Sequence, residues 1–199
     1  MDDSAKRYLL RQAREAIEAG IDGRAPEAEP APAQVREARC GVFVTLHLEG
    51  AQADGLPNCE PQLRGCIGHI RARQSLDQEI LAVARQAAFS DCRFEPLDSR
   101  EELERTVIEI SLLTPFEPVD KIEQIEPGRH GVCVEVAGRS ALLLPQVAGE
   151  RGWDRATLLR HLCLKAGRRD RCWEHPSARL YRFEAEVFDE KSLGVRVSS

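Results

Sequence analysis

Residues 63–70 read LRGCIGHI, a strand-like run in which an arginine, a cysteine and a histidine stand beside two glycines. Two glycines so close together weaken a strand, so they indicate that the backbone bends there or that another group approaches it closely. A guanidinium, a thiol and an imidazole can each bind a ligand or take part in a reaction. The segment therefore predicts a functional site on a strand.

The rest of the chain mixes helical and strand patterns. Period-two apolar or β-branched patterns predict further strands at 41–48, 106–113, 132–136, 141–144 and 180–188. Helical spacing and capping residues predict helices at 4–20, 76–89 and 154–167, with a helical turn after Ser99. Strands and helices do not alternate strictly, and no internal repeat is present. This order favours an α+β fold with a mixed, largely antiparallel sheet flanked by helices.

Three smaller features concern the first part of the chain. Gly20 stands just beyond an apolar helical stripe, so we expect the first helix to stop there. Residues 22–34 contain three prolines and predict an extended, exposed connector. Residues 50–61 are rich in turn-forming residues and lead into the 63–70 segment.

Composition limits the class of protein. The chain has 199 residues, of which 42% are apolar, enough for a packed core without disulfide bonds. Its seven cysteines are scattered without a C-x-x-C pair, and no apolar leader or membrane-spanning run is present, so we expect a cytoplasmic protein in a reducing compartment. A net charge of -5 argues against broad affinity for nucleic acid.

Cys66 and Arg64 are the first candidates for chemistry. Cys66 predicts a nucleophile if a base lies near it, and His69 qualifies only if the glycines create a turn or bulge, because i and i+3 point to opposite faces of a strand. The alternative is a buried structural cysteine or a wall of a ligand site. Arg64 can hold a carboxylate or phosphate, or it can form an ion pair within the protein.

Later segments supply weaker candidates. Asp91, Arg93 and Phe94 stand where a helix ends, and predict either a binding loop or an internally paired one. His130 lies between glycines, which we expect to leave it accessible as an acid, base or ligand, although a plain turn histidine is the alternative. A basic run at 165–171 can touch phosphates or simply complement a helix end. No histidine or cysteine spacing indicates a metal site.

These blocks together resemble a known family. LRGCIG, AAFSDCRFEPL, TVIEISLLTP, GRHGV, LLLPQVAGERGWD and LCLKAG occur in order, from about residue 5 to residue 190. The pattern resembles the AMMECR domain family, whose bacterial and archaeal members are called AmmeMemoRadiSam system protein A. The resemblance implies one domain over 5–190 with a larger lobe formed from both chain ends, a smaller lobe, and the LRGCIG segment beside a groove between them.

The resemblance also implies site residues and partners. Position by position, the motif residues are Arg64, Gly65, Cys66 and Gly68, then Asp91, Arg93 and Phe94, then His130 and Gly131, and finally Pro145, Gln146 and Lys165. One departure is Cys92, where the family usually has proline, and it suggests a less rigid loop. The system's name implies a Memo-like protein and a radical SAM protein as partners.

We therefore expect a protein that binds an anionic small molecule or modified group in the interlobe cleft, through Arg64, the amides around Gly65 and Gly68, and His130. One alternative is a thiol-dependent hydrolase or transferase with Cys66 as nucleophile and His69 or His130 as base. Others are a regulatory nucleic-acid-binding protein using 165–171 and a scaffold for the two partners. No cofactor follows from the sequence.

Overall fold

A computed structural model describes residues 1–27, 29–49, 62–169 and 171–195. The turn-rich segment predicted at 50–61, with Cys59, lies outside the described residues. The chain forms two compact units. The first contains both chain ends, with Met1–Leu112 and the residues from Val187 onward, and the second is Leu113–Glu186.

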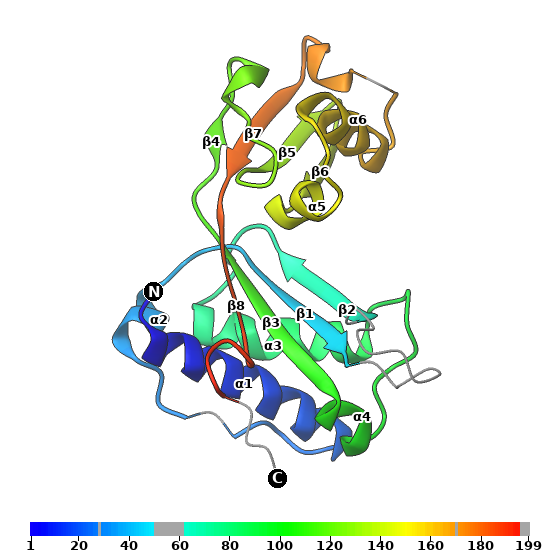
Figure 1. Ribbon diagram of the computed structural model, residues 1–199. Helices are drawn as coiled ribbons and strands as arrows, with labels where there is room; N and C mark the ends of the chain where they lie inside the picture. Colours follow the sequence, from blue (N-terminus) through cyan, green and yellow to red (C-terminus); the bar gives the residue numbers. More distant parts are fainter. Residues whose placement is uncertain (28, 50–61, 170, 196–199) are drawn as a thin grey trace. The chain divides into compact units, whose positions relative to one another are not determined.

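The first unit is a sheet with helices on one face (Figure 1). Its strands follow the order β2-β1-β3-β8, and β1 pairs antiparallel with both β2 and β3. The helices are α1 (Asp3–Ile21), α2 (Ala33–Glu37), α3 (Leu76–Phe89) and α4 (Arg100–Glu104). The strands are β1 (Val42–Leu48), β2 (Gln62–His69), β3 (Thr106–Leu113) and β8 (Ala185–Asp189).

The alternation of side chains along β1 explains which face of the sheet the helices cover. Val42, Val44 and Leu46 are fully buried in one apolar cluster with residues of α1 and α3. Their neighbours Phe43, Thr45 and His47 must point to the other face, because successive side chains of a strand alternate. The helices therefore cover the apolar face of the sheet, and the polar positions of β1 lie on the face that these helices do not cover.

The second unit has its own sheet and core (Figure 1). Its strands follow the order β4-β7-β5-β6 and are β4 (Glu117–Pro118), β5 (Gly131–Val136), β6 (Arg139–Leu143) and β7 (Arg179–Phe183). The helices are α5 (Pro145–Glu150) and α6 (Arg155–Lys165), with 3-10 turns η1 (Ile122–Gln124) and η2 (Cys172–Glu174). Leu158, Leu159 and Leu162 of α6 pack against Val132 and Val134 of β5.

The α+β fold class is confirmed, but the strand predicted at 180–188 is wrong in one respect. It is two strands, β7 and β8, which belong to different sheets. The break falls at Glu184, whose carbonyl accepts from the Thr114 amide (2.9 Å) and whose amide donates to Thr114 Oγ1 (2.8 Å). The alternation of apolar residues continues through the break, so periodicity alone does not reveal it.

The sequence predicted that the first helix stops at Gly20, and this prediction is wrong. Gly20 lies inside α1, and a Cβ atom there would come within 2.3 Å of the Phe89 ring. The glycine is therefore required by the close approach of α3. The left-handed residue beyond the helix is Gly23, with φ of +68°.

The expectation of a fold without disulfide bonds is also wrong. Cys163 at the end of α6 and Cys172 at the start of η2 form a disulfide. The chain reverses at Gly167, which has φ of +66°, and this turn brings the two buried cysteines together. Spacing within the sequence carried no such signal, because the pair is neither C-x-x-C nor part of a repeated framework.

In the described part of the chain, no helix is long and apolar enough to cross a membrane.

We predict that the thiol count of the unfolded protein depends on reduction. Before reductant is added, Cys163 and Cys172 do not react, so two more thiols titrate after reduction than before. Thiol titration in denaturant, followed by peptide mapping, measures both numbers and identifies the residues. Equal counts before and after reduction, in protein kept from reductant throughout, would contradict the prediction.

We also predict that a buried ion pair carries much of the first unit's stability. Glu190 is fully buried, and its carboxylate accepts from Arg14 Nε (2.5 Å), Arg14 Nη2 (2.6 Å) and the Ile108 amide (2.9 Å). Glu190→Gln leaves the Arg14 guanidinium, whose side chain is only 20% exposed, without its counter-charge, so urea unfolding followed by circular dichroism should show a loss of about 3–5 kcal/mol.

The matched control for this variant is Glu29→Gln. Glu29 pairs with Arg11 at 3.3 Å, but both side chains are about half exposed. An exposed pair of this kind is worth less than about 1 kcal/mol. A similar loss in both variants would show that burial does not set the strength of the Arg14–Glu190 pair.

Candidate functional site

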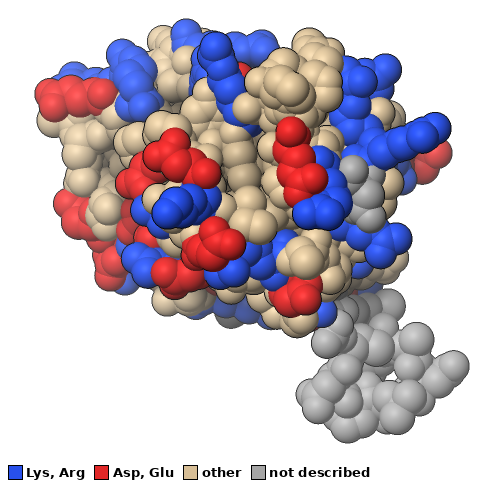
Figure 2. Space-filling model, turned by 90° about the horizontal axis from the view of Figure 1, so that it is seen from above, with Lys and Arg blue, Asp and Glu red and all other residues tan. Residues whose placement is uncertain are grey.

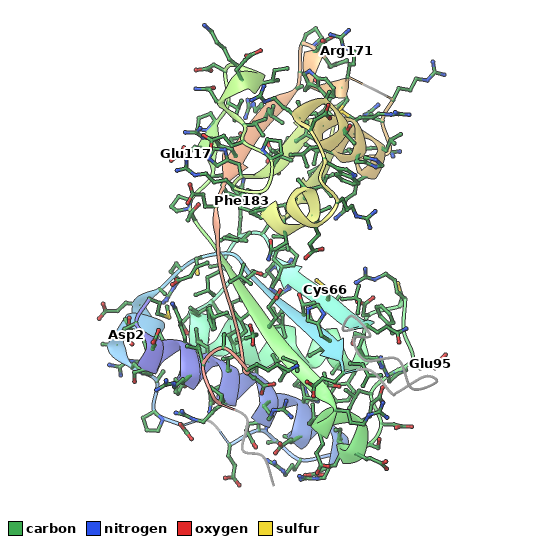
Figure 3. All side chains as sticks on the ribbon, viewed as in Figure 1. Asp2, Cys66, Glu95, Glu117, Arg171 and Phe183 are labelled. Carbon is green, nitrogen blue, oxygen red and sulfur yellow. A yellow bond between two sulfur atoms is a disulfide. The ribbon has the colours of Figure 1, made fainter. Side chains whose placement is uncertain are left out.

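Cys66 lies on β2, at one edge of the first sheet, and its side chain faces away from α1 and α3 (Figure 3). In the antiparallel register, Thr45 of β1 is the partner of Cys66, and Glu109 of β3 is the partner of Thr45. Partners across antiparallel strands hold their Cβ atoms about 4.5–5.5 Å apart. A thiol, a hydroxyl and a carboxylate therefore form a row across three strands.

Within this row the thiol has a hydrogen-bond donor. Thr45 Oγ1 donates to Cys66 Sγ at 3.4 Å. Thr45 is buried, whereas Cys66 and Glu109 are half-buried. The sulfur is thus held on the face that the helices leave uncovered, with a hydroxyl donor directed at it.

The main chain of Cys66 is held by an ion pair from the loop after α3. The Cys66 amide donates to Asp91 Oδ2 (2.9 Å), and Arg93 Nη2 donates to the Cys66 carbonyl (3.1 Å). Arg93 also donates to Asp91 through Nε (2.9 Å) and Nη2 (2.6 Å). An edge strand presents unpaired amides and carbonyls, and here the side-chain pair occupies them as a neighbouring strand would.

The Arg93 guanidinium pairs with Asp91 but still presents one side outward. The Arg93 guanidinium holds the pKa of the Asp91 carboxyl far below its ordinary value, against the raising effect of burial, so Asp91 is ionised at all ordinary pH values. The Arg93 side chain is 52% exposed, and its Nη1 has no hydrogen-bond partner among the described residues. The Phe94 ring lies 5.3 Å from the guanidinium and supports it. We call Thr45, Cys66, Asp91, Arg93 and Glu109 the Cys66 site.

Arg64 forms an ion pair within the protein, which was the alternative to ligand binding. Its Nε donates to Glu102 Oε1 at 2.6 Å, and its side chain is only 14% exposed. The register between β1 and β2 shifts at Leu46/His47, which makes Arg64 the extra residue of a β-bulge. The bulge lies before Cys66, so it does not turn His69 toward the thiol.

The two glycines of LRGCIG are explained by packing. A Cβ atom on Gly65 would lie 2.3 Å from the Ala87 carbonyl oxygen of α3, and one on Gly68 would lie 2.3 Å from the Phe43 ring. No larger side chain fits at either position. Close approach is therefore the reason for both glycines, and amides presented to a ligand are not needed to explain them.

His69 does not face Cys66. It points to the helical side of the sheet, where its Nδ1 lies 2.7 Å from Glu79 Oε2. Glu79 is buried, which acts to raise its pKa, but hydrogen bonds from His69 and the amides of Arg73 and Gln74 outweigh burial and hold that pKa below its ordinary value. His69 and Glu79 therefore join β2 to α3, and the prediction that His69 serves Cys66 as a base has no geometric support.

The remaining predicted site residues belong to the second unit. His130 is 4% exposed, so the expectation that its flanking glycines leave it accessible is wrong. Its Nδ1 accepts from the Glu126 amide at 2.9 Å, which closes the turn before β5. Gln146 lies in α5, and Lys165 is the last residue of α6. The Cys66 site is therefore built from first-unit residues alone.

The basic run at 165–171 is engaged within the protein. Arg168 Nη2 donates to the Ala137 carbonyl (2.8 Å), and Arg171 pairs with Glu174. Figure 2 shows basic side chains interspersed with acidic ones on the face it displays, rather than gathered in one positive patch. This arrangement does not favour nucleic-acid binding.

Sequence reasoning missed Thr45 and Glu109 as parts of the site. Each is a polar residue between two apolar neighbours in its strand, and this was the signal available. Their association with Cys66 depends on the register of three strands that are far apart in the sequence. That register is set by which apolar positions pack on α3, and periodicity within one strand does not supply it.

Comparison with known proteins places this geometry in one family. The model of the AMMECR1 family matches residues 10–188. The chain is 40% identical over 191 residues to Protein MK0488 of Methanopyrus kandleri, covering 92% of this chain and 87% of that one. It is 38% identical over 189 residues to Protein MJ0810 of Methanocaldococcus jannaschii, covering 92% and 89%.

A solved structure shares the fold. The crystal structure of uncharacterized protein PH0010 from Pyrococcus horikoshii matches with a TM-score of 0.84 and 36% sequence identity, over 96% of this chain and 94% of that one. The arrangement of helices and strands described above is thus found in a crystal structure of a similar chain.

We predict that His130 makes the second unit less stable in acid. Burial lowers the pKa of His130 below its ordinary 6.5, assisted by the nearby charge of Arg182. Below pH 6.5 the unfolded chain binds a proton that the folded one does not, so the free energy of unfolding falls as pH falls. Between pH 7.5 and pH 5.5 this loss amounts to at most about 1.4 kcal/mol.

The test compares the protein with His130→Asn, whose Oδ1 can accept from the Glu126 amide without titrating. Urea unfolding followed by tryptophan fluorescence reports on the second unit, because Trp153 and Trp173 both lie there. The variant should lose less stability than the parent between the two pH values. Identical losses would mean that His130 titrates alike in the folded and unfolded chains.

Proposed function

This chain belongs to the AMMECR1 family, and we propose that its first unit binds an anionic small molecule or modified group at the Cys66 site, with Arg93 as the cation that receives it. The sequence suggested Arg64 for that role. Arg93 fits that role better, because its side chain is 52% exposed, whereas the Arg64 side chain is 14% exposed and pairs with Glu102. The proposal concerns the Cys66 site alone and does not depend on His130.

The observation that carries the proposal is the fixed guanidinium beside the thiol. Asp91 and the Cys66 carbonyl hold Nε and Nη2 of Arg93, so the side chain loses little freedom when a ligand binds. Nη1 is left to donate to an anion. An anion received there is placed next to Cys66, whose own main chain is held by the same ion pair.

A second candidate function is thiol-dependent group transfer. The hydrogen bond from Thr45 Oγ1 to Cys66 Sγ favours it, because a donor on the sulfur stabilises negative charge there. In such a reaction the thiolate forms a bond to an electrophilic carbon, and the leaving group departs with the electron pair. Glu109, the next group along the row, is the one residue of the Cys66 site whose carboxylate is not committed to Arg93.

The partners we propose are a Memo-like protein and a radical SAM protein. Family membership and the name of the three-part system support this proposal. Within such a system, a small anion or modified group bound by this chain would be passed to or received from the other two proteins. The cytoplasmic location expected from the sequence stays a prediction.

The test of the anion site compares two alkylating probes at Cys66. Iodoacetate is anionic and iodoacetamide is neutral, so the ratio of their rates reports the attraction of the site for negative charge. Arg93→Gln should lower this ratio roughly three- to ten-fold, since one nearby charge is removed. Mass spectrometry of the Cys66 peptide measures both rates.

Arg100→Gln is the matched control, because Arg100 is an arginine of the same unit with a similarly exposed side chain that pairs with Asp22. It should leave the ratio unchanged. Equal effects of the two variants would refute Arg93 as the receiving cation. Thr45→Val, tested with iodoacetamide alone, separates the candidates, because slower alkylation supports the thiol-transfer function and an unchanged rate counts against it.

A further inference from the structure

The second unit contains a groove that the Cys66 site does not use. Its volume is about 800 Å³, within the range of sites that hold small organic ligands. The start of α6, the start of η1 and the turn η2 form its walls. Ile122, Leu159 and Trp173 give it an apolar lining, and three arginines and one aspartate supply the charge.

Arg155 is held in this groove without a counter-charge. Its Nε donates to the Ile125 carbonyl (2.8 Å) and its Nη2 to the Glu123 carbonyl (3.2 Å). Both acceptors are neutral, and in the described part of the chain Arg155 forms no ion pair and its Nη1 has no acceptor. The half-buried guanidinium is therefore fixed in place with its charge available to an anion.

Several ordered arginines of the chain pair with a carboxylate instead. Arg14, Arg93 and Arg182 each donate two hydrogen bonds to one carboxylate, which neutralises them. The aspartate in the groove, Asp154, is committed to the Thr157 amide at 2.8 Å as the cap of α6. Among the described residues, no carboxylate pairs with Arg155.

Trp173 supplies the second half of the site. One part of its ring packs against the core of the second unit and another lines the groove. Among the described residues it stacks on no ring, and its indole N–H has no acceptor. The other tryptophan, Trp153, is stacked on His161, with ring centroids 4.1 Å apart. Cys172 precedes Trp173 and is bonded to Cys163 of α6, so the disulfide fixes the position of the ring.

We propose that this groove binds a nucleotide, whose base stacks on Trp173 and whose phosphate is received by Arg155. The planar base of a nucleotide can stack on a half-buried aromatic face such as that of Trp173. A phosphate has the charge and the acceptor oxygens that a fixed guanidinium matches. The volume of the groove exceeds what a small aromatic acid requires.

The experiment follows the fluorescence of Trp173 alone, in the full chain carrying Trp153→Phe. Titration with adenosine monophosphate should quench the signal and saturate. Adenosine and inorganic phosphate should each bind at least ten-fold more weakly, because each retains only one of the two contacts. Adenosine that binds as tightly as adenosine monophosphate would overturn the proposal.

Variants then assign the contacts. Arg155→Gln in the same background should weaken binding of adenosine monophosphate at least ten-fold. Arg155→Lys keeps the positive charge and should restore part of the affinity, which separates loss of the phosphate contact from loss of folding. Arg151→Gln is the matched control, because Arg151 lies over Trp153 and does not line the groove. Binding that is unchanged by Arg155→Gln, or weakened equally by Arg151→Gln, refutes the assignment.

Discussion

The alternation of side chains along β1 is the constraint on which the first unit depends. Val42, Val44 and Leu46 are buried against α1 and α3, so Thr45 is forced to the opposite face. Antiparallel pairing then carries this choice to both neighbours of β1, which places Cys66 and Glu109 beside Thr45. The same constraint sends His69 to the helical side. The apolar pattern of β1 thus decides which side chains lie beside the Cys66 thiol.

Some arginine side chains of this protein form ion pairs that hold the fold together, and others can receive a ligand. The group to which the arginine donates decides between these two roles. Arg14 and Glu190 form a buried pair that joins α1 to the end of the chain, and Arg64 is held by Glu102. Arg93 is intermediate, because Asp91 neutralises it while one nitrogen remains without a described acceptor. Arg155 is held by carbonyls alone. Guanidiniums that are fixed but incompletely paired are the ones that can receive a ligand.

Much of the fold could be predicted from local pattern. The strands predicted at 41–48 and 106–113 and the helix predicted at 76–89 are present to within one residue, because a long amphipathic run has one way to bury its apolar face. The break at Glu184 could not be predicted, since both halves of the 180–188 run alternate in phase. The disulfide between Cys163 and Cys172 depends on the turn at Gly167, which a count of cysteines does not reveal.

For the candidate site, the sequence by itself identified the family and predicted candidate residues in LRGCIG and in the segment after α3. Only the tertiary structure decided their partners. Asp91 and Arg93 hold the main chain of Cys66, Arg64 pairs with Glu102, and the glycines make room for Ala87 and Phe43. The physical reason is that residue type and spacing act along the chain, whereas hydrogen bonds and close contacts depend on strand register and helix packing between distant segments.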